Sequence, residues 1–365
     1  MPSNAPINAA RLSAFLITTA ILPTLTAAQS YSSCNPTNTS QFPCPADTGL
    51  CQSTVFETDF TTGDNTSWTT TAGNVTYSDA GAAFTIAERG DAPTIETDFY
   101  IFYGRVEVTM KAAPGTGIVS SIVIESDDLD EIDWEFLGGS NTMVQSNYFG
   151  KGNTTSYDRE AEHAVTTPQD TSHVYAIDWT ASRIEWLIDN TTVRTLAYAD
   201  AVSGQNFPQT PATVRLGIWA GGDEDNSYWT RVWAGGNTTY SAAAGMPWTM
   251  TVEKVAVTNY GPAGSYNYTD STGDAGSVAL IGTDCGGSDG GSSSSSSSSS
   301  SGSSSKRTAS VSAYAASTPS GTGATATPTP TPSGGTYETS GGVERLGGGL
   351  REFLFGSVFV ALLLL

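Results

Sequence analysis

Residues 130–138 of this chain read Asp-Glu-Ile-Asp-Trp-Glu-Phe-Leu-Gly, and acidic and apolar residues alternate through the middle of the stretch. A period of two is typical of a β-strand, whose successive side chains point to opposite faces of the sheet. Glu131, Asp133 and Glu135 would then share one face, while Ile132 and Trp134 would face a core. The pattern predicts a strand that carries a row of three carboxyl groups on its open face.

Three neighbouring carboxylates repel one another, so the row destabilises the fold unless protons are shared and the acids perform chemistry. Cleavage of a glycosidic bond uses two carboxyl groups, one protonated and one ionised, and Glu131 and Glu135 are the natural pair. Asp133 lies between them and could hydrogen-bond to the nucleophile. Spacing assigns neither role, because positions four apart on a flat strand are about 13 Å apart, whereas retaining enzymes hold the two groups at about 5 Å.

A solvated strand face and a calcium site are two alternatives to a catalytic role for the acidic row. A solvated strand usually mixes charges of both signs, and the three acids have no basic partner among the flanking strand residues. Calcium prefers a loop that supplies several oxygen atoms. The sequence therefore favours a catalytic row.

The regions around this strand predict many further short strands. Strand-like runs occupy residues 99–110, 118–124, 173–179, 183–188 and 193–196, with turn signals between them and without strong amphipathic helix patterns. Trp134, Trp179 and Trp186 sit at alternating positions and are predicted to be core residues. These features predict an all-β sandwich or jelly roll.

Both ends of the chain carry predicted processing signals. Residues 1–28 combine Arg11, an apolar stretch and small residues before Gln29, which is the pattern of a secretory signal peptide. Residues 341–365 end in an apolar run after a spacer, which is the pattern of a glycosylphosphatidylinositol (GPI) attachment signal. Ser340 is the predicted attachment residue, with Ser333 or Gly334 as alternatives. The mature protein is thus expected outside the cell, anchored at the plasma membrane or in the wall.

The region between the folded part and the anchor signal has no means of forming a core. Residues 286–340 contain an unbroken serine run at 292–301 and a Thr/Pro-rich stretch at 325–332. Such a composition predicts a disordered, O-glycosylated stalk. Residues 29–285 remain, which is a suitable length for one catalytic domain.

The cysteines indicate the redox environment of the protein, and the net charge indicates which classes of partner it can bind. The four cysteines of a secreted chain, Cys34, Cys44, Cys51 and Cys285, predict two disulfides. Three pairings are open, and if all four pair, one bond must tie the N-terminal segment to the end of the folded region. A net charge of −21 argues against nucleic acid or an anionic membrane surface as a partner. We expect a monomer that meets the membrane only through its lipid anchor, and the chemistry requires no cofactor.

The Glu-x-Asp-x-Glu pattern at residues 131–135 resembles the catalytic motif of glycoside hydrolase family 16. The resemblance implies a β-jelly roll with a concave substrate cleft and retention of configuration. It also implies Glu131 as nucleophile, Glu135 as general acid/base and Asp133 as the assisting carboxyl group. Residues 145–152 and 159–160 resemble the transglycosylating branch of that family. With the secretion signal, stalk and anchor signal, the chain is similar to fungal Crh-type cell-wall transglycosylases, which are taken to cut chitin and transfer it to β-glucan or chitin.

Polysaccharide sites need aromatic platforms and polar side chains. Trp219 lies next to glycines that would let a sugar approach the backbone closely, and it is the first candidate platform. Tyr148 is the next candidate, and the resemblance adds Trp233. The polar candidates for binding sugar hydroxyls are Gln145, Asn147, Lys151, Arg159 and Glu160, although polar residues are also common at ordinary strand and loop positions.

Two alternatives to a transglycosylase share the same residues. One is a hydrolase of β-glucan or chitin that uses water as the acceptor. The other is a non-catalytic, polysaccharide-binding wall protein, whose signature would be the loss of one glutamate. Since Glu131 and Glu135 are both present, an enzyme is favoured.

Overall fold

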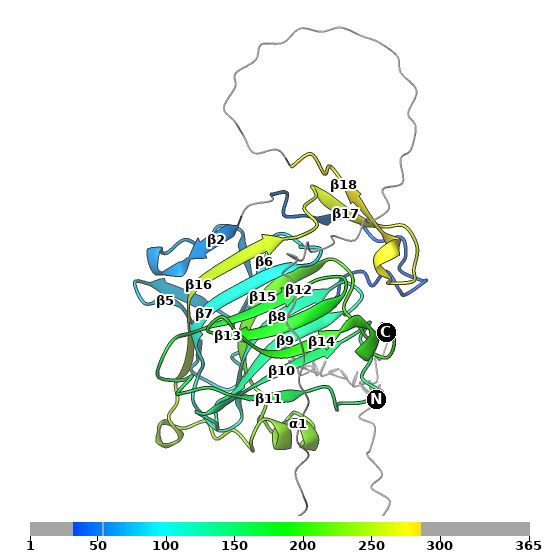
Figure 1. Cartoon of the computed structure of the whole chain (residues 1–365). Coiled ribbons are helices and arrows are strands. Elements are labelled where there is room, and N and C mark those ends of the chain that lie inside the picture. The colour runs from blue at the N-terminus through cyan, green and yellow to red at the C-terminus, as the bar shows by residue number, and fades with distance from the viewer. Residues whose placement is uncertain (1–31, 53–54, 286–365) are drawn as a thin grey trace, which may run out of the picture. The chain divides into compact units, whose positions relative to one another are not determined.

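The computed structural model describes residues 32–52 and 55–285 (Figure 1). The predicted signal peptide at 1–28, the stalk at 286–340, the attachment residue Ser340 and the anchor signal at 341–365 lie outside these residues. Within the described ranges, no helix is long and apolar enough to cross a membrane.

The first large sheet has seven antiparallel strands and contains the acidic stretch near one side. In spatial order its strands are β11 (Ala161–Ala164), β10 (Met143–Phe149), β9 (Glu131–Leu137), β8 (Ile118–Ser126), β15 (Ala212–Ala220), β6 (Thr94–Thr97) and β3 (Trp68–Ala72). The strand β9 therefore carries the predicted acidic row.

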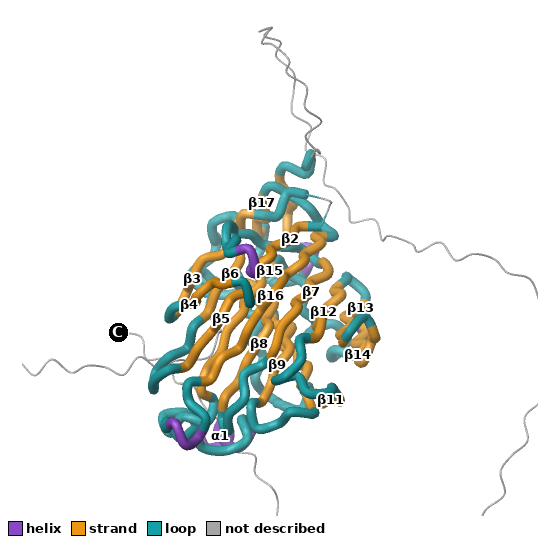
Figure 2. Tube along the Cα trace, turned by 90° about the vertical axis from the view of Figure 1, so that its left-hand side faces the viewer, coloured by secondary structure: helices purple, strands orange, loops and turns teal. Residues whose placement is uncertain are grey.

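The second large sheet packs against the first, and Figure 2 shows the strands of both layers with α1 at their lower end. Its strands are β14 (Thr191–Ala197), β13 (Arg183–Ile188), β12 (His173–Trp179), β7 (Gly104–Lys111), β16 (Trp248–Asn259), β5 (Gly81–Ile86) and β4 (Val75–Ser78), with β2 (Phe56–Asp59) paired to β16. This arrangement of two antiparallel sheets confirms the predicted all-β sandwich.

The remaining elements are a small sheet and short helices. The small sheet, called here the end sheet, consists of β1 (Asp47–Thr48), β17 (Ser265–Tyr268) and β18 (Val278–Ile281). The helix α1 spans Tyr228–Trp233, and four 3₁₀ turns lie at Phe60–Thr62, Tyr198–Asp200, Ala242–Ala244 and Ala275–Ser277.

The core between the two large sheets is built from the apolar side of the alternating strands. Ile132, Trp134 and Phe136 of β9 are at most 1% exposed. Phe136 meets Tyr175 of β12 edge to face, with ring centroids 4.6 Å apart. Trp186 of β13 crosses the core and donates a hydrogen bond to the backbone carbonyl of Asp133 (3.0 Å). Burial of such large side chains stabilises the fold by about 2–3 kcal/mol each, and it fixes which face of β9 is open.

The strand predictions hold where alternation is clean. Strands β7, β8, β12 and β13 occupy the predicted runs, and Trp134, Trp179 and Trp186 are core residues as predicted. The prediction was wrong for residues 99–103, which make only the isolated bridges Gly49 to Tyr100 and Ile101 to Ala212. Tyr103 has a φ of +59°, outside the range of a strand, so the regular pairing of β7 begins only at Gly104.

Two disulfides close the N-terminal segment and the end sheet. Cys34 pairs with Cys44, and Cys51 pairs with Cys285 across 234 residues of sequence. The second bond is the predicted tie between the N-terminal segment and the end of the folded region. It constrains a very long loop of the unfolded chain, which is where a disulfide stabilises most.

Candidate active site

The acidic row lies on the face of β9 that points away from the core. In the antiparallel ladder, Glu135 stands opposite Gln145 and Asp133 stands opposite Asn147 of β10. Asp133 is 1% exposed, whereas Glu131 and Glu135 are half-buried. We call this side of the first sheet the acid-bearing face. It places one enclosed carboxyl group between two that a ligand can reach.

Glu135 has the environment of a proton donor. Burial raises the pKa of Glu135 to about 8, with further contributions from the negative charges of Glu131 and Glu160. A carboxyl group with this pKa keeps its proton at neutral pH. Glu135 can therefore act as a general acid where an ordinary glutamate would be ionised.

Asp133 is also held in its neutral form. Burial raises the pKa of Asp133 well above its ordinary value, and the charges of Glu135 and Glu131 act in the same direction. The nearby charge of Arg194 opposes the rise. Both side-chain oxygens of Asp133 are buried without a hydrogen-bond partner. A protonated Asp133 can donate a hydrogen bond to Glu131, which is the arrangement that a nucleophilic carboxylate needs from its neighbour.

Two predicted tryptophans meet beside the acidic row. Trp219, near the end of β15, and Trp233, the last residue of α1, stack with ring centroids 6.0 Å apart and an interplanar angle of 27°. The indole nitrogen of Trp233 donates to the side-chain oxygen of Gln145 (2.9 Å), which itself lies opposite Glu135. Burial raises the pKa of Glu160, and the nearby indole N–H of Trp233 partly opposes that rise. An aromatic pair joined to polar groups in this way suits the apolar ring faces and the hydroxyl groups of a sugar.

The structure places the candidate platform Tyr148 on the wrong face. Tyr148 stands opposite Ile132 in the ladder, so its ring points into the core and the residue is only 6% exposed. Alternation already contained this information, because Tyr148 follows Asn147 directly and neighbouring strand residues face opposite sides. Asn147 is the residue of the two that shares the open face with Asp133.

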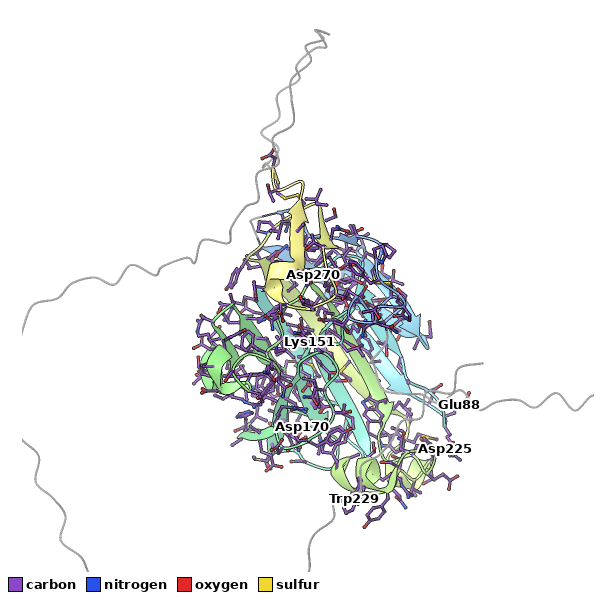
Figure 3. All side chains as sticks on the ribbon, turned by 90° about the vertical axis from the view of Figure 1, so that its right-hand side faces the viewer. Glu88, Lys151, Asp170, Asp225, Trp229 and Asp270 are labelled. Atoms are coloured by element: carbon purple, nitrogen blue, oxygen red, sulfur yellow. A yellow bond between two sulfur atoms is a disulfide. The ribbon has the colours of Figure 1, made fainter. Side chains whose placement is uncertain are left out.

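The side chains of Lys151 and Arg159 are engaged by neighbouring loops. The ammonium group of Lys151 (Figure 3) binds Asp274 at 2.6 Å, in a surface hollow next to Tyr198. Arg159 is 8% exposed, and its guanidinium group donates to the backbone carbonyls of residues 153 and 156. Both side chains therefore hold loops together, and the guanidinium group of Arg159 also lies 4.7 Å from the ring centre of Phe149, which stands opposite Glu131. That either side chain binds substrate stays a prediction.

One charged residue near the acidic row was not found from the sequence. Arg194 belongs to β14 of the second sheet, and its guanidinium group lies 4.6 Å from the ring centre of Trp186. It donates to the backbone oxygen (2.8 Å) and side-chain hydroxyl (2.9 Å) of Ser146 on β10. Its charge lowers the pKa of Asp133. The contact joins strands of different sheets, so no local pattern could reveal it.

A resident metal ion has no evident place in this structure. Within residues 32–52 and 55–285, no group of three or more His, Cys, Asp and Glu side chains is arranged to hold one.

Comparison with known proteins gives consistent matches. The model of the family described as glycosyl hydrolases family 16 matches residues 62–235. Crh-like protein 1 of Aspergillus fumigatus is 56% identical over 263 residues, which cover 72% of this chain and 70% of that protein. Congo red hypersensitive protein 1 of Saccharomyces cerevisiae is 46% identical over 253 residues, and the match covers 68% of this chain but 48% of that protein.

A solved structure supports the same fold at high identity. The structure described as "Crh5 transglycosylase in complex with NAG" is 54% identical, with a TM-score of 0.65. The match covers 68% of this chain and 99% of that chain. The residues that the family model matches, 62–235, include the acidic row.

Proposed function

The chain belongs to glycosyl hydrolases family 16, among its fungal Crh-like members, and from this premise we propose a retaining transglycosylase of the fungal cell wall. The proposed enzyme cleaves chitin and transfers the released chain to a β-glucan or chitin acceptor, which cross-links the wall. The observation that carries the proposal is the acidic row, in which Glu135 has a pKa of about 8 and lies close to Glu131 on an accessible face.

In the first step, Glu135 and Glu131 act on opposite sides of the bond that breaks. Glu135 donates its proton to the glycosidic oxygen, so the leaving chain departs as a neutral alcohol. The carboxylate of Glu131 attacks the anomeric carbon and forms a glycosyl ester. Asp133 donates its hydrogen bond to Glu131 and so steadies the nucleophile and then the departing carboxylate.

In the second step, the ionised Glu135 takes a proton from a hydroxyl group of the acceptor. The acceptor oxygen attacks the anomeric carbon, the ester bond to Glu131 breaks, and Glu135 is again protonated. Transfer outcompetes hydrolysis when a sugar, rather than water, occupies the place of attack. The stacked pair of Trp219 and Trp233, with Gln145 and Glu160 beside it, supplies surfaces on which a sugar can rest.

We also propose that the protein acts outside the cell as a GPI-anchored monomer attached through Ser340. Two disulfides agree with passage through an oxidising secretory route. The charge of −21 suits neutral polysaccharide better than an anionic partner.

The test is a transfer assay with size separation. The purified protein is incubated with a chitin oligosaccharide donor and a fluorescent glucan or chitin oligosaccharide acceptor. We expect labelled products longer than the acceptor, and none with Glu131→Gln. Shortened donor without label transfer would instead indicate a hydrolase. No reaction with chitin or β-glucan donors would indicate a non-catalytic binding protein.

A further inference from the structure

The acid-bearing face carries a charged pair that the proposed mechanism does not use. Glu125 of β8 stands directly opposite Glu131 in the antiparallel ladder. Ile122 and Ile124 of the same strand belong to the core, so alternation places Glu125 on the acid-bearing face together with Glu131. Directly opposed residues of an antiparallel pair have Cβ atoms about 5 Å apart. A fourth carboxyl group therefore lies next to the one that is proposed as the nucleophile.

The second member of the pair is Arg215. It belongs to β15, the neighbour of β8 in the sheet, and Val214 and Leu216 on either side of it face the core. Its Nη1 donates to Oε2 of Glu125, and its Nη2 lies 3.4 Å from Oε1 of Glu96 on β6. One guanidinium group is thus shared by carboxyl groups from the strands on both sides of β15.

The pair is enclosed, although it lies on the side of the sheet that substrate would reach. Glu125 is 1% and Arg215 5% exposed, so a sugar has little access to either side chain. Charges in such a place act strongly on their neighbours, because little water screens them. Burial raises the pKa of Asp127, for example, and the charge of Arg215 opposes that rise. An effect on neighbouring carboxyl groups is therefore favoured over direct contact with substrate.

Charged side chains surround Glu131 on several sides. They are Asp133 and Glu135 of β9, Glu125 of β8, Arg215 of β15, Arg194 of β14, and Arg159, which lies against Phe149 opposite Glu131. The raised pKa values of Asp133 and Glu135 keep both groups neutral when Glu131 is ionised. Glu125 is ion-paired and faces Glu131 across the sheet. Without a cation, its negative charge would favour the protonated form of Glu131.

We propose that Arg215, paired with Glu125, is a positioning residue that keeps Glu131 ionised and directed at the anomeric carbon. Arg215 cancels the charge of Glu125, so the nucleophile does not face a second uncompensated carboxylate. Because both side chains of the pair are buried, this compensation is present before the donor binds. The inference rests on the proposed function, which makes Glu131 the nucleophile. The alternative is that the pair only joins β6, β8 and β15.

The test uses a donor whose leaving group needs no proton from Glu135. In a β-fluoride of a chitin oligosaccharide, the bond from the anomeric carbon to fluorine breaks as the ester bond to Glu131 forms. Fluoride leaves with the bonding electron pair and is measured with an ion-selective electrode. The acidic limb of the pH profile of kcat/KM for fluoride release then reports the ionisation of Glu131 in the free enzyme.

The two members of the pair should move this acidic limb in opposite directions. Arg215→Gln leaves Glu125 uncompensated, so Glu125 and Glu131 share one proton to higher pH, and the limb should rise by about one pH unit. Glu125→Gln leaves Arg215 without that counter-charge, so the limb should move to lower pH. The variant with both substitutions loses one charge of each sign and should have a limb close to that of the unaltered protein.

Arg105→Gln is the matched control. Arg105 binds Glu107 at 2.8 Å on β7 of the second sheet, so its loss also breaks a pair of arginine and glutamate. This control should leave the acidic limb in place. If Arg215→Gln does not fold, Glu125→Gln and the double variant still test the inference, because they predict a lowered and an unchanged limb.

Three results would overturn the inference. The first is a limb that moves in the same direction, or not at all, in the two single variants. The second is a rise in KM with the limb unmoved, since the pair would then serve only the shape of the sheet. The third is an equal shift in Arg105→Gln. Failure of the proposed function is distinguishable, because the unaltered protein would then release no fluoride and transfer no label.

Discussion

Two groups of carboxyl groups with raised pKa values lie on and beside the start of β9, and only one of them has the character of an active site. The first is the acidic row of β9, where the pKa of Glu135 is raised to about 8. The second, called here the buried acid cluster, consists of Asp47, Asp127, Asp128 and Asp130. The pKa of Asp47 is also raised to about 8, by burial and by the charges of Asp127 and Asp128.

The two groups differ in access and in what holds their oxygen atoms. Every member of the buried acid cluster is at most 9% exposed. Asp130 accepts from the backbone N–H groups of residues 151 and 209 and from the hydroxyl of Thr210, while Asp127 accepts from the hydroxyl of Tyr100. The hydrogen bonds of Asp130 fasten residues 151, 209 and 210 to the residue that precedes β9. A raised pKa therefore identifies a catalytic acid only together with an open face.

The largest expected effect separates the two groups by activity. Glu131→Gln removes the nucleophile and Glu135→Gln removes the proton donor, so each should lower label transfer by about a thousandfold or more. Asp127→Asn, in the buried acid cluster, should keep transfer within about threefold of the unaltered protein. Initial rates of label transfer from a short chitin oligosaccharide donor measure the effect of all three substitutions. A comparable loss in Asp127→Asn would remove the distinction drawn between the groups.

The next largest effect concerns the stability that the Cys51–Cys285 disulfide gives to the end sheet, which contains Asp47. Replacing Cys51 and Cys285 by serine opens a loop closed across 234 residues, and the free energy of unfolding should fall by about 2–4 kcal/mol. Transfer at 25 °C should persist, because the bond lies by the end sheet rather than the acid-bearing face. Chemical denaturation gives the stability.

The Cys34–Cys44 bond provides the matched control for that prediction. It closes a loop with a sequence separation of only 10, so its removal should lower the free energy of unfolding by less. Loss of transfer at 25 °C in the Cys51/Cys285 variant, with the protein still folded, would show that the end sheet supports the catalytic row directly.

A smaller effect on stability should depend on pH. Asp47 has a pKa of about 8 when folded and an ordinary value near 3.8 when unfolded. Its neutral form is favoured in the folded state, so its stabilising contribution is complete below about pH 4 and is lost as pH rises towards 8. Asp47→Asn should therefore be more stable than the parent by about 1–2 kcal/mol at pH 8, with little difference at pH 4. Melting temperatures of both proteins between pH 4 and pH 8 test this prediction. A difference in melting temperature that stays constant over this pH range would contradict it.

The sequence predicts those parts of the site that depend on local periodicity. The acidic row and the core tryptophans follow from a period of two within single strands, and the long disulfide follows from the isolation of Cys285. Applied strictly, the same period would have excluded Tyr148. The positions of Arg194 and Trp233 depend on contacts between distant segments, one from the second sheet and one from α1. The buried acid cluster was missed for the same reason, because Asp47 meets Asp127 and Asp128 only in the folded chain.

The smallest predicted effect tests whether charge from a neighbouring segment tunes the acidic row. After burial and Glu131, the negative charge of Glu160 also raises the pKa of Glu135, so Glu160→Gln should lower that pKa and move the alkaline limb of transfer activity slightly to lower pH. The measurement is the pH profile of kcat/KM, which reports the free enzyme. Rates at a single pH would also include any change in how Trp233, which lies near Glu160, is positioned.

Glu162→Gln is the control for this last prediction. Glu162 lies on β11 and raises the pKa of Glu160, but it is not among the groups that raise the pKa of Glu135. The Glu162 variant should therefore leave the alkaline limb in place, and a shift equal to that of Glu160→Gln would mean that general surface charge controls Glu135. If the alkaline limb shifts in the Glu160→Gln variant and not in the Glu162→Gln variant, the charge of Glu160 specifically contributes to the raised pKa of Glu135. Burial is the largest cause of the raised pKa in both groups, so the two groups differ in the access of a ligand to their carboxyl groups and not in the main cause of the raised pKa.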